Sequence, residues 1–171
     1  MSHISAGVEY ALHCLLFIAH PQGSVTEASV RDLSELQGVP FDYVAKLFTK
    51  LHKAKLIIAT EGAKGGIRLA KPPHEITVLD VVDAIDGRKK LFDCKEIRNR
   101  CAVFDNDPPA WASSGLCAIH SLMIDADNKM RDVLAAQTLA GLASQFGRKA
   151  PPEFEQQITR WLGDKGSRRI I

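Results

Sequence analysis

Apolar positions in the first fifty residues recur at intervals of three and four, the period of an α-helix packed on one side. This pattern predicts helices at about residues 5–20 and 29–36, and a third that begins near Phe41. Ser29 is a suitable N-cap for the second helix, and Gly38 in the following turn can adopt a positive φ. Two helices joined by a short turn containing glycine are typical of a helix-turn-helix.

The period becomes strand-like after the third helix. Residues 56–60 and 67–70 are typical of β-strands, and the glycine-rich stretch between them, residues 62–66, is typical of a turn. We therefore expect a β-hairpin directly after the helix-turn-helix, which is the position of a wing. Two prolines then separate this hairpin from an apolar helix at 76–85 that ends at Gly87.

The second half of the chain begins with residues 88–116, which lack a sustained period and are interpreted as a functional loop. A long helix is predicted at 118–146. Its apolar positions step by four and three, a heptad-like seam suited to pairing with a partner helix; they are Ile119, Met123, Ala126, Met130 and Val133. A short amphipathic helix then precedes a basic tail; its apolar face is Phe154, Ile158, Trp161 and Leu162.

Together these elements predict a mainly α fold with a small β-hairpin wing, a winged helix-turn-helix followed by a long dimerisation helix. The expected organisation has four parts. They are a DNA-binding winged helix-turn-helix domain at 1–87, a cysteine-bearing cofactor loop at 88–117, a dimerisation helix at 118–146, and a C-terminal amphipathic helix with a basic tail at 147–171.

Composition narrows the class of protein. The net charge is only +2, so any basic surface for nucleic acid must be concentrated on one face. The apolar run at 14–19 is too short to span a bilayer and no signal peptide is visible, which predicts a cytoplasmic protein with no membrane partner and with reduced thiols. The sequence contains no nucleophile elbow, phosphate-binding loop or dinucleotide motif, so we do not expect an enzyme.

The third helix and the wing carry the side chains that we expect to contact double-stranded DNA. They are Tyr43, Lys46, Thr49, Lys50, Lys53, Lys64, Gly65 and Arg68. A basic helix face alone is typical of any solvated surface, but a helix-turn-helix followed by a wing favours DNA binding. A homodimer paired through the long helix would hold two recognition helices roughly 34 Å apart, matching a palindromic operator. An adaptor that binds protein through its winged helix is the competing interpretation.

The cysteines and histidines offer two sets of metal ligands. One set lies within one subunit and suits an iron–sulfur cluster or zinc; it is Cys94, Cys101, Cys117 and His120. The other set begins with Glu9 and His13, four residues apart on one helix face, and takes two cysteines from the other subunit. A cluster-free thiol–disulfide sensor is a third interpretation. Cys14, inside an apolar helical run, is interpreted as a core residue.

The wing and the helix after it also resemble a known family. The string Leu-Ile-Ile-Ala-Thr-Glu-Gly-Ala-Lys-Gly-Gly-Ile-Arg-Leu-Ala-Lys-Pro-Pro from Leu56, with Ile-Thr-Val-Leu-Asp-Val-Val-Asp-Ala-Ile-Asp-Gly ending at Gly87, is similar to the Rrf-two family of winged-helix regulators. The likeness covers nearly the whole chain. It implies a homodimer, a wing that enters the minor groove, and an iron–sulfur cluster that controls operator binding.

Within that family, residues 7–14 and 94–100 are most similar to the redox-sensing RsrR branch. This likeness implies a [2Fe–2S] cluster held by a Glu and a His of one subunit and two Cys of the other. On this chain the implied ligands are Glu9, His13, Cys101 and Cys117, with Cys94 and His120 in reserve. The spacing Cys117-Ala-Ile-His120 instead resembles the IscR branch, so both ligand sets stay open. Glu61 replaces a wing arginine, which shifts the expected minor-groove contact to Lys64.

Overall fold

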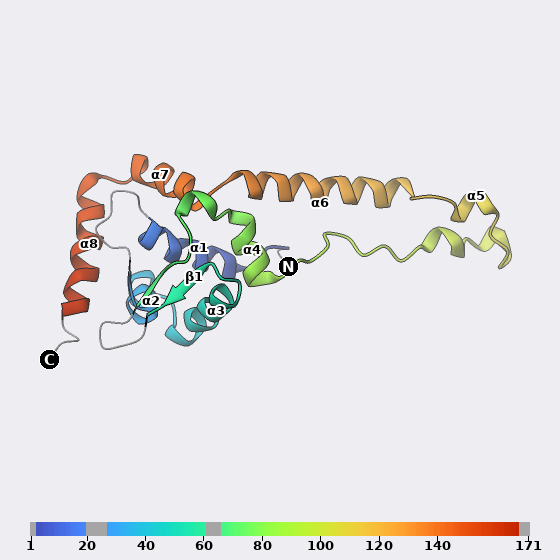
Figure 1. Ribbon diagram of the computed structural model, residues 1–171. Coiled ribbons are helices and arrows are strands. Elements are labelled where there is room, and N and C mark those ends of the chain that lie inside the picture. Colours follow the sequence, from blue (N-terminus) through green and yellow to red (C-terminus); the bar gives the residue numbers. More distant parts are fainter. Residues whose placement is uncertain (1–2, 20–26, 61–65, 168–171) are drawn as a thin grey trace. The chain divides into compact units, whose positions relative to one another are not determined.

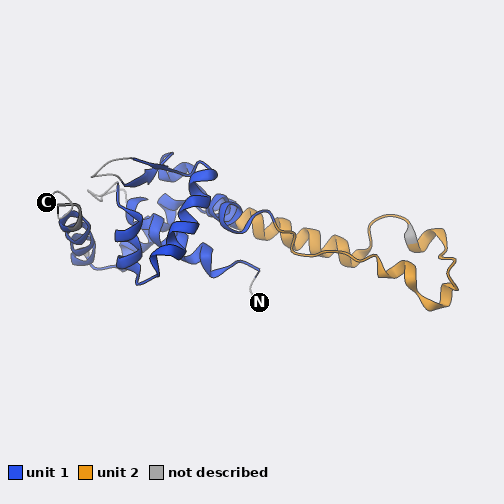
Figure 2. Cartoon of the chain, turned by 90° about the horizontal axis from the view of Figure 1, so that it is seen from below, with its two compact units in different colours: residues 1–88, 134–171 blue, residues 89–133 orange. Residues whose placement is uncertain are grey.

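The structure is a computed structural model that describes residues 3–19, 27–60 and 66–167 (Figure 1). The chain divides into two compact units, coloured separately in Figure 2: unit 2 is Lys89–Val133, and unit 1 is the remainder on both sides of it. The described helices and strands are α1 (Ala6–Ala19), α2 (Val30–Gln37), α3 (Phe41–Lys53), β1 (Ile57–Ala59), β2 (Ile67–Leu69), α4 (Val78–Asp86), α5 (Ala110–Ser113), α6 (Ala118–Ala136), α7 (Leu139–Lys149) and α8 (Pro152–Ser167). The predicted mainly α fold with one small hairpin is confirmed.

The helix-turn-helix of unit 1 forms where the sequence predicts it. Ser29 caps α2, since its hydroxyl oxygen accepts a hydrogen bond from the Asp32 amide at 3.0 Å. Gly38 ends α2 in the left-handed region, with φ of +65°, which a residue with a Cβ rarely adopts. The chain then turns through Pro40 directly into α3. Local capping and turn chemistry therefore set the angle between the two helices.

The hairpin after α3 is antiparallel, with Ile58 opposite Arg68 at its centre. Ala28, just before α2, forms an isolated antiparallel bridge with Ile67, the first residue of β2, so the hairpin is attached to the helix-turn-helix through this strand. The tip, residues 61–65, lies outside the described residues, and the predictions for Glu61, Lys64 and Gly65 lie there with it.

Helix α1 is the centre of the core, packing against α2, α3, α4 and α7. Its buried face includes Ala11, Cys14 and Leu15, each without exposed surface. The largest fully buried side chains elsewhere in the core are Leu33, Leu51, Ile76, Leu139, Val44 and Val81. The prediction that Cys14 is a core residue is confirmed, and burial raises the pKa of its thiol to about 12.

One predicted element is wrong: residues 118–146 do not form a single helix. Helix α6 ends at Ala136, and α7 starts after Thr138, whose hydroxyl accepts a hydrogen bond from the Gly141 amide at 3.1 Å. At the break, Thr138 forms an antiparallel bridge with Thr77, the N-cap of α4. This long-range backbone pairing breaks the helix, and it ties α7 to the winged helix instead of extending the seam.

The C-terminal amphipathic helix is confirmed as α8. Leu162 is buried in the core of unit 1, and Ile158 and Trp161 pack partly against it. Of the predicted basic tail, Arg168 and Arg169 lie outside the described residues. The structure describes no helix that is both long and apolar enough to cross a membrane.

Unit 2 contains short ordered pieces in place of a featureless loop. Two 3-10 turns, at Ile97–Arg100 and Ala102–Phe104, precede α5. The guanidinium of Arg98 joins these pieces, because it donates hydrogen bonds to the carbonyls of Ser114 at 3.3 Å and Gly115 at 2.6 Å. The unit ends with most of α6, which has no buried residue along its length.

Candidate nucleic-acid interface and metal-ligating side chains

The outward face of α3 carries polar side chains that the sequence assigns to DNA. Lys46 and Lys53 are exposed there, while Val44, Leu47, Phe48 and Leu51 of the same helix are buried. Thr49 is also exposed, and its hydroxyl donates to the Ala45 carbonyl at 2.9 Å. An amphipathic second helix of a helix-turn-helix with cations on its outer side has the geometry needed to enter a major groove.

Two of the predicted DNA-facing residues have contacts inside unit 1. The ammonium of Lys50 donates to the Ile85 carbonyl in the last turn of α4, at 2.6 Å. The ring of Tyr43 meets Tyr10 of α1 edge to face, at 5.7 Å between centroids. Both side chains therefore connect α3 to a neighbouring helix, a role that their outward positions in the sequence pattern did not indicate.

In the wing, Arg68 is the described cation that the sequence assigned to DNA. It is exposed at the middle of β2, and its position opposite Ile58 fixes the face of the hairpin on which it lies. A guanidinium on a hairpin beside a recognition helix suits a phosphate or minor-groove contact.

Glu9 and His13 lie one turn apart on α1, and both are exposed. They line a cavity of about 680 Å³ whose other lining side chains are mostly apolar and come from α1 and the two residues before it, from α4, from the end of α6 and from α7. The two side chains could supply one carboxylate oxygen and one imidazole nitrogen to a shared site. They supply no thiolate, and a [2Fe–2S] cluster takes four protein ligands.

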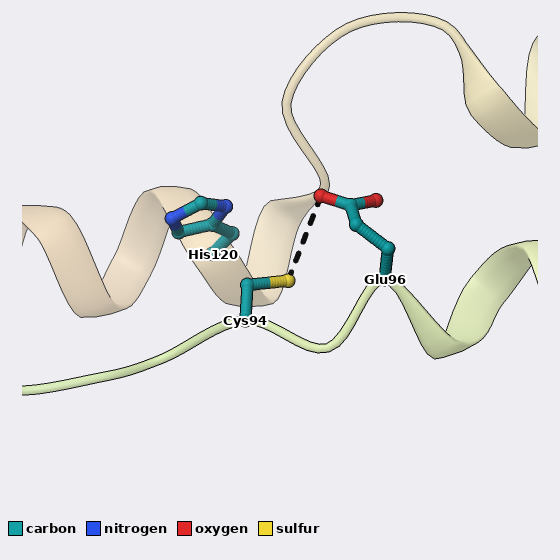
Figure 3. Close-up of side chains that lie close together, drawn as sticks. All are labelled: Cys94, Glu96 and His120. Carbon is teal, nitrogen blue, oxygen red and sulfur yellow. Dashed lines mark hydrogen bonds between the residues drawn. The ribbon is translucent and has the colours of Figure 1, made fainter.

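A different set of ligand-type side chains converges in unit 2. Figure 3 shows Cys94 and Glu96, from the segment before the first 3-10 turn, facing His120 of α6. Their donor atoms all lie within 4.8 Å of one another, and the Cys94 thiol donates to Glu96 Oε1 at 3.7 Å. Beside them, the pKa of the Asp93 carboxyl is lowered, chiefly by a hydrogen bond from Lys95.

The remaining two loop cysteines do not join this group. Cys101 is exposed, and Cys117 is half-buried at the start of α6, where its sulfur accepts from the His120 amide at 3.4 Å. Across the described ranges 3–19, 27–60 and 66–167, Cys94, Glu96 and His120 are the single group of three or more such donors at ligating separation. The four-ligand set expected within one subunit is therefore not assembled.

Sequence reasoning missed Glu96, and with it Arg98. The Glu96 backbone has a φ of +50°, unusual for a residue with a Cβ, and its second carboxylate oxygen accepts from Arg98 Nε at 3.1 Å. The only signal in the sequence was a glutamate two residues after a cysteine, which is too common in charged loops to single out.

The chain is similar to a known protein family along most of its length. The family model Rrf2, described as an iron-dependent transcriptional regulator, matches residues 4–145, which leaves α8 outside the match. The HTH-type transcriptional regulator IscR of Vibrio campbellii is 30% identical over 134 residues, or 78% of this chain and 72% of the relative.

Two solved structures are similar in fold. CymR, the global cysteine regulator of B. subtilis, matches with a TM-score of 0.64 and 22% identity, covering 85% of this chain and 98% of CymR. The oxidized form of Staphylococcus aureus CymR matches with a TM-score of 0.55 and 27% identity, covering 83% of this chain and 96% of CymR.

Proposed function

Because the chain belongs to the Rrf2 family of DNA-binding transcriptional regulators, we propose that it binds a palindromic double-stranded operator as a homodimer. The same membership confirms the expectation of a regulator in place of an enzyme. The observation that carries the proposal is the outward cationic face of α3. This helix comes after α2 and the turn at Gly38, and the hairpin comes directly after it. We also place the protein in the cytoplasm, because DNA is accessible there and thiols stay reduced there.

The DNA contacts divide into two groups. Lys46 and Lys53 of α3 and Arg68 of the wing act on phosphates, and each neutralised phosphate adds roughly 0.9 to the slope of log affinity against log salt. Thr49 and Tyr43 lie on the same exposed face and are the proposed base-edge contacts. We also assign Lys64 and Gly65 to the wing tip on sequence grounds.

Helix α6 is the proposed dimerisation element. Ile119 is 63% exposed and Val133 is 66% exposed, although both are large apolar residues on the predicted seam. A monomer would leave this stripe in water, whereas pairing with a second copy would bury it. Two-fold pairing also places the two recognition helices on the two halves of a palindrome.

We propose further that operator affinity depends on a [2Fe–2S] cluster held by Glu9 and His13 of one subunit together with Cys101 and Cys117 of the other. Two observations support this set: Glu9 and His13 are exposed on one face of α1, and Cys101 is exposed. When bound, the cluster supplies reversible one-electron redox chemistry. The protein's part is mechanical. Because α1 packs directly on α3, a displacement of α1 on a change of cluster state would be passed on to α3, the proposed recognition helix.

The test is a gel-shift series with oxidised, reduced and cofactor-free protein on one palindromic duplex. We expect operator affinity to differ at least tenfold between two of these states, a difference of about 1.4 kcal/mol. Lys46→Ala should weaken binding in all states, whereas His13→Ala should remove the difference between them. Equal affinities in all three states would discard the control by a cluster, and loss of palindrome preference would discard the dimer.

A cluster-free regulator that senses oxidation through thiols is the second candidate. It is favoured by the exposure of Cys101 and by the structural match to an oxidized form of CymR. Absorbance of anaerobically purified protein separates the two, because a cluster gives visible sulfur-to-iron bands and a thiol sensor gives none. Protein with stoichiometric zinc and no colour would point to zinc in its place.

A further inference from the structure

We propose that Arg31 of α2, held against the ring of Phe41, is a further contact to the phosphate backbone of the operator. The contacts assigned above lie on α3 and in the wing, so this residue extends the interface to a third element. The inference rests on the proposed function, because it concerns the same binding of DNA. It does not depend on the [2Fe–2S] assignment or on any cysteine.

The guanidinium of Arg31 lies over the ring of Phe41, with Cζ at 4.5 Å from the ring centroid. Arg31 is in the first turn of α2 and Phe41 is the first residue of α3, so the contact joins the starts of the two helices. A cation at this distance is attracted to the negative face of an aromatic ring. The ring therefore restricts a long side chain that would otherwise sample many rotamers.

Both side chains reach the surface. Arg31 is exposed, and Phe41 is 37% exposed although it is a large apolar residue. Within residues 3–19, 27–60 and 66–167, the Arg31 guanidinium forms no ion pair with a carboxylate. A stacked guanidinium uses only its face, so the N–H groups at its edge can donate to an external anion.

The position of Arg31 suits a phosphate better than a base. In a helix-turn-helix, the N-terminal residues of the second helix contact base edges, and the first helix crosses the DNA backbone. Helix α2 packs beside α3 (Figure 1), and Arg31 lies on α2 next to the first residue of α3. The strand that borders the groove would pass this point. Arginine can also bind one phosphate through two parallel hydrogen bonds.

The two residues have different roles, and these can be measured separately. Arg31 supplies the charge, so its removal lowers both the affinity for DNA and the salt dependence of that affinity. Phe41 is a positioning residue that acts through Arg31. Without the ring the charge is still present and the salt slope stays the same, but the side chain must be ordered on binding, which lowers the affinity.

The experiment measures binding of the full-length protein, at several salt concentrations, to a palindromic duplex selected with the parent protein. Arg31→Met should lower the affinity at least about fivefold and the salt slope by about 0.9 for each bound subunit. Arg31→Lys should keep the slope. Phe41→Leu should lower the affinity about threefold at an unchanged slope. Phe41→Tyr, which keeps the ring, should bind as the parent does.

A second measurement locates the contact on the DNA. Single phosphates of one half-site are replaced in turn by neutral methylphosphonate. We expect a position at which this replacement weakens binding of the parent protein but does not weaken binding of Arg31→Met further. Such a non-additive pair identifies two groups that interact directly.

Arg148→Met is the matched control, because Arg148 is an exposed arginine on α7; it should keep the parent's affinity and salt slope. Thermal melts of every variant separate loss of the contact from loss of folding. A folded Arg31→Met protein with the parent's affinity and slope would overturn the inference and leave the proposed function intact. A parent protein that binds no duplex would overturn the proposed function and this inference with it.

Discussion

Tyr10 of α1 and Tyr43 of α3 meet edge to face, with ring centroids 5.7 Å apart and ring planes at 86°. Tyr10 directly follows Glu9, and Tyr43 stands on the outward face of the reading helix. The two helices also approach closely nearby, since a Cβ added at Gly7 would lie 3.1 Å from Leu47 Cδ2. The helix that carries two proposed cluster ligands is therefore in direct contact with the helix proposed to read DNA.

Replacing Tyr10 by Ala is expected to loosen this connection. The aromatic pair contributes about 0.5–1.5 kcal/mol, so the melting temperature should fall modestly. The ratio of operator affinities in the oxidised and reduced states should fall as well, as measured by gel shift. Tyr10→Phe keeps the ring contact and serves as the control. An unchanged ratio in Tyr10→Ala would show that the signal does not pass through this pair.

Lys50 is expected to behave differently from the other lysines of α3. Its ammonium donates to the Ile85 carbonyl at 2.6 Å, so Lys50→Met should destabilise the fold by about 1 kcal/mol. Lys46→Met should instead leave stability nearly unchanged and lower the salt slope of operator binding by roughly one. Chemical denaturation and binding isotherms at several salt concentrations measure the two effects. If Lys50→Met also lowered the salt slope of operator binding by about one, Lys50 would be a phosphate contact and this expectation would be wrong.

Cys14 is expected to make stability depend on alkaline pH. Its pKa rises from 9.0 to about 12 on folding, so between these values the unfolded chain releases a proton that the folded chain keeps. Stability from this group is thus complete below pH 9 and falls by about 1.4 kcal/mol per pH unit above it. Denaturation of the parent and of Cys14→Ala across this range should show the smaller slope in the variant. Cys101→Ala, at an exposed position, should keep the parent's slope.

Lysine on the exposed seam of α6 is expected to break the dimer without unfolding the chain. Ile119→Lys and Val133→Lys place a charge where a partner helix would bury an apolar side chain, and neither site supports the core of its own chain. Sedimentation velocity should report monomers and gel shifts should report weaker operator binding. Asn128→Lys, on the opposite side of α6, is the control. Dimers of undiminished strength in both seam variants would place the interface elsewhere.

The winged helix was predictable because its signals are local. Ser29 caps α2 with the hydroxyl that the sequence offers, and Gly38 takes the positive φ that only its missing Cβ makes easy. The break between α6 and α7 was not predictable in the same way. A heptad-like seam leads up to it, and the interruption comes from the pairing of Thr138 with Thr77, which is distant in the sequence.

The candidate site divides along the same line. Spacing alone puts Glu9 and His13 on one face of α1, and hydropathy alone buries Cys14, because both follow from the helical period. No period relates Glu96 to His120, or the Lys50 ammonium to the Ile85 carbonyl. These contacts join segments far apart in the chain, and a side chain finds such a partner only after the backbone has folded both into reach. The sequence therefore determined the type of each element and which face of it is buried. Which side chains of different elements contact one another was decided only by the folded chain.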